Sequence, residues 1–120
     1  MADNTNKGLK RLVNAVVFSW QGVKAAYKHE EAFRQEVLLL AMAIPLALWL
    51  GDTGLEKGLL ISSVLLILIV EILNSAIEAI VDRFGGEMHE LSGRAKDMGS
   101  AAVTLALINA AVIWLFLLLL

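Results

Sequence analysis

The sequence has 120 residues, of which 58% are hydrophobic and 18% are charged, and its formal net charge is −2. Soluble domains of this length carry a larger charged fraction, so the composition excludes an ordinary soluble fold and indicates one membrane domain. Cysteine is absent, which excludes a disulfide framework and thiolate chemistry.

The first predicted element is an amphipathic surface helix over residues 6–28. Its apolar residues recur every three or four positions from Leu9 to Tyr27, as on one face of a helix. The basic residues occupy other positions: Lys7, Lys10, Arg11, Lys24 and Lys28. Such a helix lies in the headgroup plane of a membrane or packs on its own protein, and the two interpretations can coexist. No continuous apolar segment precedes it, so we expect no cleavable signal peptide and expect the first membrane span to direct targeting.

Three transmembrane helices are predicted, over residues 32–50, 59–81 and 101–120. A short glycine-bounded turn, residues 51–58, joins the first two spans, which are therefore expected to be antiparallel neighbours. Residues 83–100 form a polar connection that is expected to be helical again by Arg94. The predicted fold class is thus an all-α membrane protein with three transmembrane helices and an N-terminal surface helix.

The distribution of basic residues predicts the orientation in the membrane. Nine of the ten Lys and Arg residues lie at or before the start of the first span, or between the second and third spans. The positive-inside rule then places the N-terminus and residues 83–100 in the cytoplasm. The short turn and the C-terminus are expected on the other side.

One face of the second span carries acidic and amide side chains. At about 100° per residue, four residues fall on a single narrow stripe: Glu71, Asn74, Glu78 and Asp82. An acidic residue deep in a spanning helix costs about 2.5 to 3.5 kcal/mol on insertion scales and usually marks a functional pathway. The stripe is therefore either a working site or a polar clasp between helices, and the pattern favours the working site.

The predicted topology brings further polar residues to the membrane level of the cytoplasmic end of this stripe. They are Glu30, Arg34, Gln35, Glu36, Glu87, His89, Glu90, Lys96 and Asp97. Carboxylates suit Mg²⁺, which keeps several waters and is shared with substrate phosphates. Lys and Arg side chains neutralise phosphate oxygens, and a carboxylate within the bilayer can accept a proton from an alcohol. His89 and its acidic neighbours lack helical metal-ligand spacing, so no zinc site is predicted.

The sequence contains no GxxxxGK[ST] loop and no HRD or DFG motif, so any phosphoryl transfer must use the membrane helices themselves. Three spans also offer the acidic stripe few protein surfaces to face. Helices of another copy are therefore expected to cover it in a closed cyclic homo-oligomer. A proton or cation channel in such an oligomer is a remote alternative use of intramembrane carboxylates.

Two segments, EILNSAIEAIVDR (Glu71–Arg83) and HELSGRAKDMGSAAV (His89–Val103), closely resemble the small integral-membrane diacylglycerol kinases of Gram-negative bacteria. The resemblance covers essentially the whole chain, including EAFRQE before the first span. It implies a homotrimeric helical bundle in the bacterial inner membrane, with cytoplasmic active sites shared between subunits. It also implies transfer of the γ-phosphoryl group of MgATP to diacylglycerol, giving phosphatidic acid. Gram-positive relatives leave undecaprenol, an isoprenoid alcohol, as the alternative substrate, and no nucleic-acid partner is expected.

The resemblance implies roles for residues at matching positions. Glu71 would be the general base on the lipid hydroxyl with Asn74 beside it, whereas Glu30 and Glu78 would hold the metal at the ATP phosphates. Further nucleotide contacts would be Arg11, Phe18, Glu87, Met88, His89, Lys96 and Asp97, with Phe18 standing where close relatives are expected to have tyrosine. Lipid contacts besides Glu71 would be Ser19, Trp20, Arg34, Gln35, Glu36, Trp49, Ser100 and Trp114.

Overall fold

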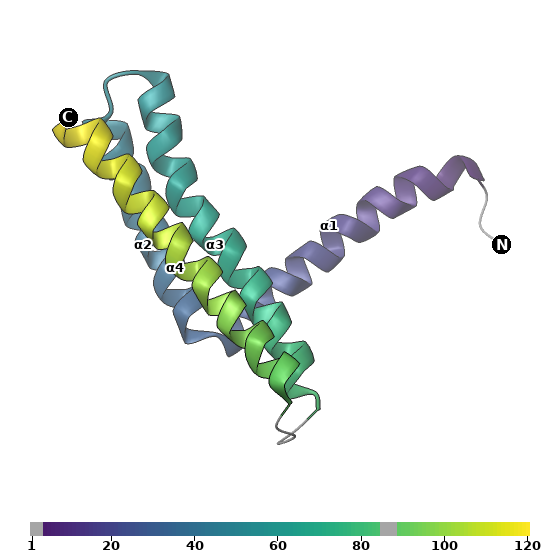
Figure 1. The fold of residues 1–120 in the computed structure, drawn as a ribbon. Helices are drawn as coiled ribbons and strands as arrows, with labels where there is room; N and C mark the ends of the chain where they lie inside the picture. The colour runs from purple at the N-terminus through teal and green to yellow at the C-terminus, as the bar shows by residue number, and fades with distance from the viewer. Residues whose placement is uncertain (1–3, 85–88) are drawn as a thin grey trace.

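The computed structural model describes the backbone of residues 4–84 and 89–120 and the side chains of residues 7–84 and 89–120. All regular structure in these ranges is helical. The helices are α1 (Asn4–His29), α2 (Glu31–Leu50), α3 (Gly54–Asp82) and α4 (Glu90–Leu119). In Figure 1, α2, α3 and α4 form a bundle, from which α1 projects to one side.

Three helices, α2, α3 and α4, are long and apolar enough to cross a membrane. This confirms the predicted all-α membrane fold. The limits of the lipid-embedded segments stay a prediction. α3 begins at Gly54, within the predicted turn of residues 51–58. α4 begins at Glu90, in agreement with the expectation of helix by Arg94, so most of the polar connection belongs to α4.

Side-chain caps explain both early helix starts. Thr53 precedes α3, and its Oγ1 accepts a hydrogen bond from the Glu56 N–H at 3.1 Å. His89 precedes α4, and its Nδ1 accepts from the Leu91 N–H at 3.0 Å. Each cap satisfies a backbone donor that would otherwise lack a partner in the first helical turn, so the polar residues that follow enter the helix.

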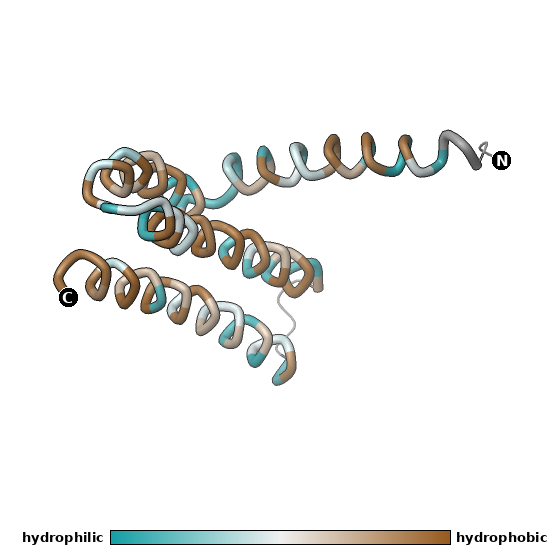
Figure 2. The backbone as a smooth tube through the Cα atoms, turned by 90° about the horizontal axis from the view of Figure 1, so that it is seen from above, coloured by the Kyte–Doolittle hydropathy of each residue, from teal (hydrophilic) through white to brown (hydrophobic). Residues whose placement is uncertain are grey.

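α3 is the central helix of the bundle, since it packs against both α2 and α4 (Figure 2). The contact with α4 is antiparallel. At one end the Trp114 Nε1–H donates to the Ser63 Oγ at 3.1 Å and lies 3.2 Å from the Leu60 carbonyl oxygen. Along the middle of the contact, Ala106 and Ala110 of α4 are buried with Ile67, because small side chains allow close helix approach.

The C-terminal end of α1 is anchored to the bundle. Ala26 packs with Phe33 of α2 and Leu68 of α3 in one buried cluster. Arg34 joins the two helices at the bend, where its Nη1 donates to the Tyr27 carbonyl oxygen at 2.7 Å and to that of Lys28 at 3.1 Å. These are among the last carbonyl groups of α1, which a cation stabilises. The bend places Glu30, the residue between α1 and α2, beside the bundle.

Candidate active site

Burial along the acidic stripe of α3 is graded. Glu71 and Asn74 are 6% and 8% exposed, Glu78 is half-buried and Asp82 is exposed. The Asn74 Nδ2 group donates to the Glu78 Oε1 at 3.4 Å, one helical turn apart. The stripe therefore runs from a buried carboxylate to an exposed one at the end of the helix.

Further carboxylates lie near Glu71, two of them from outside α3. Glu30 at the bend and Glu36 of α2, together with Glu78 of α3, lie close enough to Glu71 for mutual charge repulsion. The Glu36 Oε2 is buried, and within the described part of the chain it has no hydrogen-bond partner. A structural clasp would supply a hydrogen-bond donor to this buried oxygen, so its unpaired state favours a binding or catalytic role for the carboxylates.

Lys96 brings a positive charge from α4 to the same end of the bundle. Its Nζ lies 3.0 Å from the Asp82 Oδ1, and Glu78 is near enough to attract it as well. Both members of this ion pair are partly exposed, so it contributes little to stability. Asp82 was placed on the acidic stripe by its helical position, but its partner could not be predicted from the sequence.

The described donor groups fit a magnesium ion shared with substrate. Within residues 7–84 and 89–120, no three Asp, Glu or His side chains converge into a complete protein metal site. Mg²⁺ does not require one, because one or two carboxylates, waters and substrate phosphates suffice. Glu30 and Glu78, which both lie near Glu71, could supply two such carboxylates, and the Asn74 amide lies beside Glu78.

Among the described residues, no hydrogen bond or ion pair joins the remaining predicted site residues to these carboxylates. Arg11, Phe18 and Ser19 are exposed on the projecting helix α1, where the Ser19 hydroxyl donates to the Ala15 carbonyl oxygen at 2.7 Å. Gln35, Asp97 and Ser100 are exposed, and the His89 Nδ1 is engaged in capping α4. Glu87 and Met88 lie outside the described residues.

Trp49 and Trp114 lie toward the opposite end of the bundle from the carboxylates. Trp49 is 79% exposed near the turn after α2, and the Trp114 indole contacts α3 at Leu60. Leu60 precedes Glu71 by eleven residues, which corresponds to about 16 Å along a helix. If a lipid hydroxyl reaches Glu71 as the resemblance implies, Trp114 would therefore contact a more distal part of that lipid.

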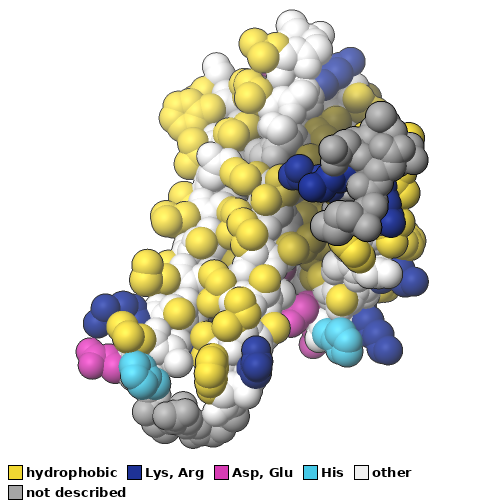
Figure 3. All heavy atoms as spheres, turned by 90° about the vertical axis from the view of Figure 1, so that its right-hand side faces the viewer, with side chains coloured by type: hydrophobic (Ala, Val, Ile, Leu, Met, Phe, Trp, Pro, Cys, Tyr) yellow, Lys and Arg dark blue, Asp and Glu magenta, His cyan; other side chains and the backbone are white. Residues whose placement is uncertain are grey.

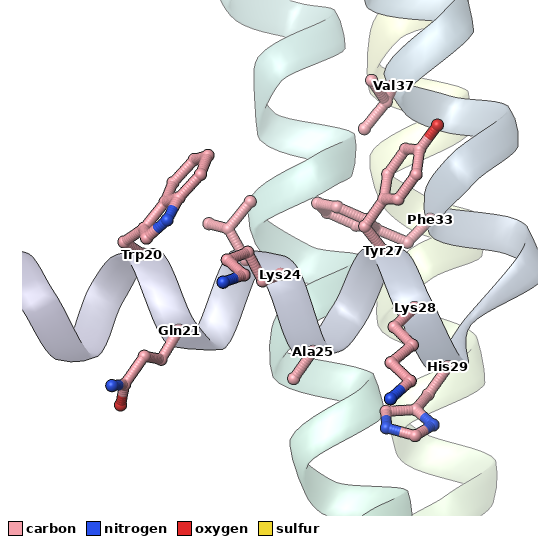
Figure 4. Close-up of a pocket in the computed structure, with 10 residues that line it drawn as sticks. Trp20, Gln21, Lys24, Ala25, Tyr27, Lys28, His29, Phe33 and Val37 are labelled. Carbon is pink, nitrogen blue, oxygen red and sulfur yellow. The ribbon is translucent and has the colours of Figure 1, made fainter.

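A hollow lies at the bend between α1 and α2 (Figure 4). Trp20 and Tyr27 of α1 point to the same side as Phe33 and Val37 of α2, whereas Gln21 and Lys28 point to the other side. In Figure 3, most charged side chains in view lie on α1 and at the lower end of the bundle, whereas much of the remaining face in view is hydrophobic. This arrangement suits an acyl chain on one side and water on the other.

The fold and site define an all-α membrane protein in which several carboxylates, one of them buried, lie near one end of the helical bundle. A model of the family described as prokaryotic diacylglycerol kinase matches residues 17–118. The chain is 56% identical over 118 residues to a diacylglycerol kinase of Escherichia coli (strain K12), covering 98% of this chain and 96% of that protein. It is 53% identical over 107 residues to a diacylglycerol kinase of Haemophilus influenzae, covering 89% and 91%. It is also 53% identical over 112 residues to one of Pseudomonas aeruginosa, covering 93% and 91%.

The chain belongs to the prokaryotic diacylglycerol kinase family and is a lipid kinase. This membership confirms the resemblance drawn from the two sequence segments. The roles assigned to individual residues stay predictions.

Proposed function

We propose that the protein transfers the γ-phosphoryl group of MgATP to the hydroxyl group of diacylglycerol, giving phosphatidic acid and ADP. The observation that carries this proposal is the position of Glu71, which is 6% exposed within the apolar helix α3 and lies near three other carboxylates. Diacylglycerol is the substrate named for the relatives in Escherichia coli and Haemophilus influenzae.

In the proposed reaction, Glu71 acts as the general base. Its carboxylate accepts the proton of the lipid hydroxyl while the lipid oxygen forms a bond to the γ-phosphorus. The bond from that phosphorus to the bridging oxygen of ATP breaks, and ADP leaves. Eleven residues separate Glu71 from Asp82 at the end of α3, or about 16 Å along the helix, so the base lies where a lipid hydroxyl can arrive.

Glu30 and Glu78 are the proposed carboxylate ligands of the magnesium ion. When bound, Mg²⁺ would neutralise charge on the transferred phosphoryl group. Asn74 lies on α3 between Glu71 and Glu78, and its amide donates a hydrogen bond to Glu78. Asn74 therefore orients the Glu78 carboxylate toward the metal and nucleotide. Lys96, held by Asp82, supplies a cation for the phosphate oxygens at the exposed end of the stripe.

The lipid is proposed to approach through the bend between α1 and α2. There Trp20 and Tyr27 offer exposed apolar surface, and Glu36, farther along α2, lies near Glu71. The protein is further proposed to be a homotrimer of the bacterial inner membrane, with its carboxylate end cytoplasmic. Support for this orientation comes from the concentration of Lys and Arg at that end.

Lipid-dependent ADP release tests the proposed function. The full chain, purified in mixed micelles with MgATP, is supplied with diacylglycerol, undecaprenol or no lipid. We expect ADP release and phosphatidic acid formation with diacylglycerol and much slower turnover with undecaprenol. Clearly faster turnover with undecaprenol would show that undecaprenol, rather than diacylglycerol, is the substrate. If liposomes that contain the protein conduct ions but release no ADP, the result would favour the alternative that the protein is a proton or cation channel.

A further inference from the structure

Gly99 of α4 occupies a place in the helix contact where no side chain fits. The residue is buried against the side chain of Asn74 in α3. A β-carbon added at Gly99 would lie 3.1 Å from the Asn74 Cγ and closer still to its Oδ1. The Asn74 amide oxygen therefore fills the space that any other residue at position 99 would need.

Asn74 has little freedom to move away from such an intrusion. Its side chain is 8% exposed, and its Nδ2 group donates to the Glu78 Oε1. Its Oδ1 faces Gly99 and has no hydrogen-bond partner among the described residues. Rotation of the amide would relieve the collision with a new methyl group, but it would withdraw the donor from Glu78.

A second glycine of α4 shows that the close contact is specific to one position. Gly93 lies on an exposed part of the same helix, and a β-carbon there would meet nothing within 4 Å. Glycine in a helix interior costs about 1 kcal/mol relative to alanine. At Gly99 the close approach of Asn74 gives a physical reason for that cost, whereas no described contact gives one at Gly93.

We propose that Gly99 is a positioning residue for the nucleotide side of the reaction. Gly99 leaves room for the Asn74 amide, which donates a hydrogen bond to Glu78. That hydrogen bond holds Glu78 in the orientation in which it would bind the magnesium ion of MgATP. This inference rests on the proposed function, in which Glu78 is a metal ligand. It adds a residue of α4 that touches neither substrate nor metal.

The test compares Gly99→Ala with Gly93→Ala in the full chain in micelles. The MgATP dissociation constant is measured by titration calorimetry, together with the KM values for MgATP and diacylglycerol and the thermal midpoint. Gly99→Ala is expected to weaken MgATP binding and raise its KM by about tenfold, as for one lost hydrogen bond to a charged group. The KM for diacylglycerol is expected to change less than about twofold, because Glu71 itself is not displaced.

Gly93→Ala is expected to leave every value at that of the wild type. Equal MgATP affinity in the two alanine variants would overturn the proposal. A Gly99→Ala chain that does not fold would also overturn it, because Gly99 would then serve packing rather than positioning.

A double-mutant cycle tests whether Gly99 acts through Asn74. In an Asn74→Ala chain the colliding amide is absent, so adding Gly99→Ala is expected to change the MgATP dissociation constant less than about twofold. If Gly99→Ala weakened MgATP binding by the same factor with and without Asn74→Ala, the two residues would act independently and the proposal would be overturned. The activity of the wild-type chain separates failure of the positioning role from failure of the proposed function. A wild-type chain that phosphorylates no diacylglycerol would refute that function, whereas an active wild type with an unperturbed Gly99→Ala variant would refute only the positioning role.

Discussion

Glu71 and Glu78 lie on one face of α3, but their surroundings differ. Glu71 is 6% exposed and Glu78 is half-buried nearer the end of the helix. A lipid hydroxyl approaches from the bilayer, whereas a nucleotide approaches from water. The deeper carboxylate is therefore assigned to the proton and the shallower one to the metal, and single substitutions can separate these two roles.

Glu71→Gln is expected to lower kcat by at least about a hundredfold, which is the usual contribution of a general base. Glutamine keeps the shape of the side chain but accepts no proton at neutral pH. MgATP affinity, measured by calorimetry, is expected to stay near the wild-type value because the change removes no proposed metal ligand. Near-normal turnover in this variant would refute the assignment of Glu71 as the base.

Glu78→Gln and Glu30→Gln are expected to weaken MgATP binding instead. Each removes one carboxylate from the proposed ligand set, and charged ligands dominate Mg²⁺ affinity. Glu31→Gln is the matched control, because Glu31 is exposed beside Glu30 in the first turn of α2. Calorimetric titration with MgATP measures the effect, and a Glu78→Gln variant with wild-type affinity would exclude Glu78 as a ligand.

At the scale of the elements, the α3–α4 contact links a tryptophan at one end of the bundle to the proposed nucleotide site at the other. Trp114 donates its indole N–H to the Ser63 Oγ, and a phenylalanine there would fill similar space without that bond. Trp114→Phe is expected to lower the free energy of unfolding by about 1 kcal/mol, as for one interhelical hydrogen bond in a membrane.

Thermal unfolding in micelles measures this effect, with Trp49→Phe as the control, because Trp49 is 79% exposed. The control variant is expected to unfold at the wild-type midpoint. Equal midpoints for the two variants would show that the Trp114 hydrogen bond does not hold α3 and α4 together.

The helices and the acidic stripe could be predicted from the sequence, because apolar runs and helical periodicity are local properties. The residue roles came from the family resemblance. The pair of Lys96 with Asp82 and the contact of Gly99 with Asn74 could not be predicted, because both depend on the register of α4 against α3. The glycines that bound residues 51–58 predict a turn, but α3 already begins at Gly54, because Thr53 caps the helix.

At the scale of the whole molecule, the single chain brings only part of the predicted site together. Glu30, Glu36, Glu71, Glu78 and Lys96 gather near one end of the bundle. Arg11 and Phe18 lie on the portion of α1 that projects away from it (Figure 1). If these two residues contact nucleotide, the proposed trimer would allow them to do so in the site of a neighbouring subunit.

Subunit mixing tests this shared site. Glu71→Gln removes the base, and Arg11→Ala is expected to lower activity by about tenfold through loss of a charged contact to phosphate. In randomly mixed trimers each proposed site would take Glu71 from one chain and Arg11 from its neighbour. Equal mixing by co-refolding is then expected to restore about a quarter of wild-type activity, because half of the sites keep Glu71 and half of their neighbours keep Arg11.

Mixing Glu71→Gln with Glu78→Gln is the matched control for this experiment. Both residues lie on α3 and are brought together within one chain, so these mixed trimers are expected to recover no activity. The stoichiometry of each mixture is verified by light scattering in micelles. Trimers of Glu71→Gln and Arg11→Ala with no activity above that of Arg11→Ala alone would show that Arg11 serves its own chain or none. In that case α1 would act as a membrane-surface anchor, and its basic residues would contact lipid headgroups rather than nucleotide.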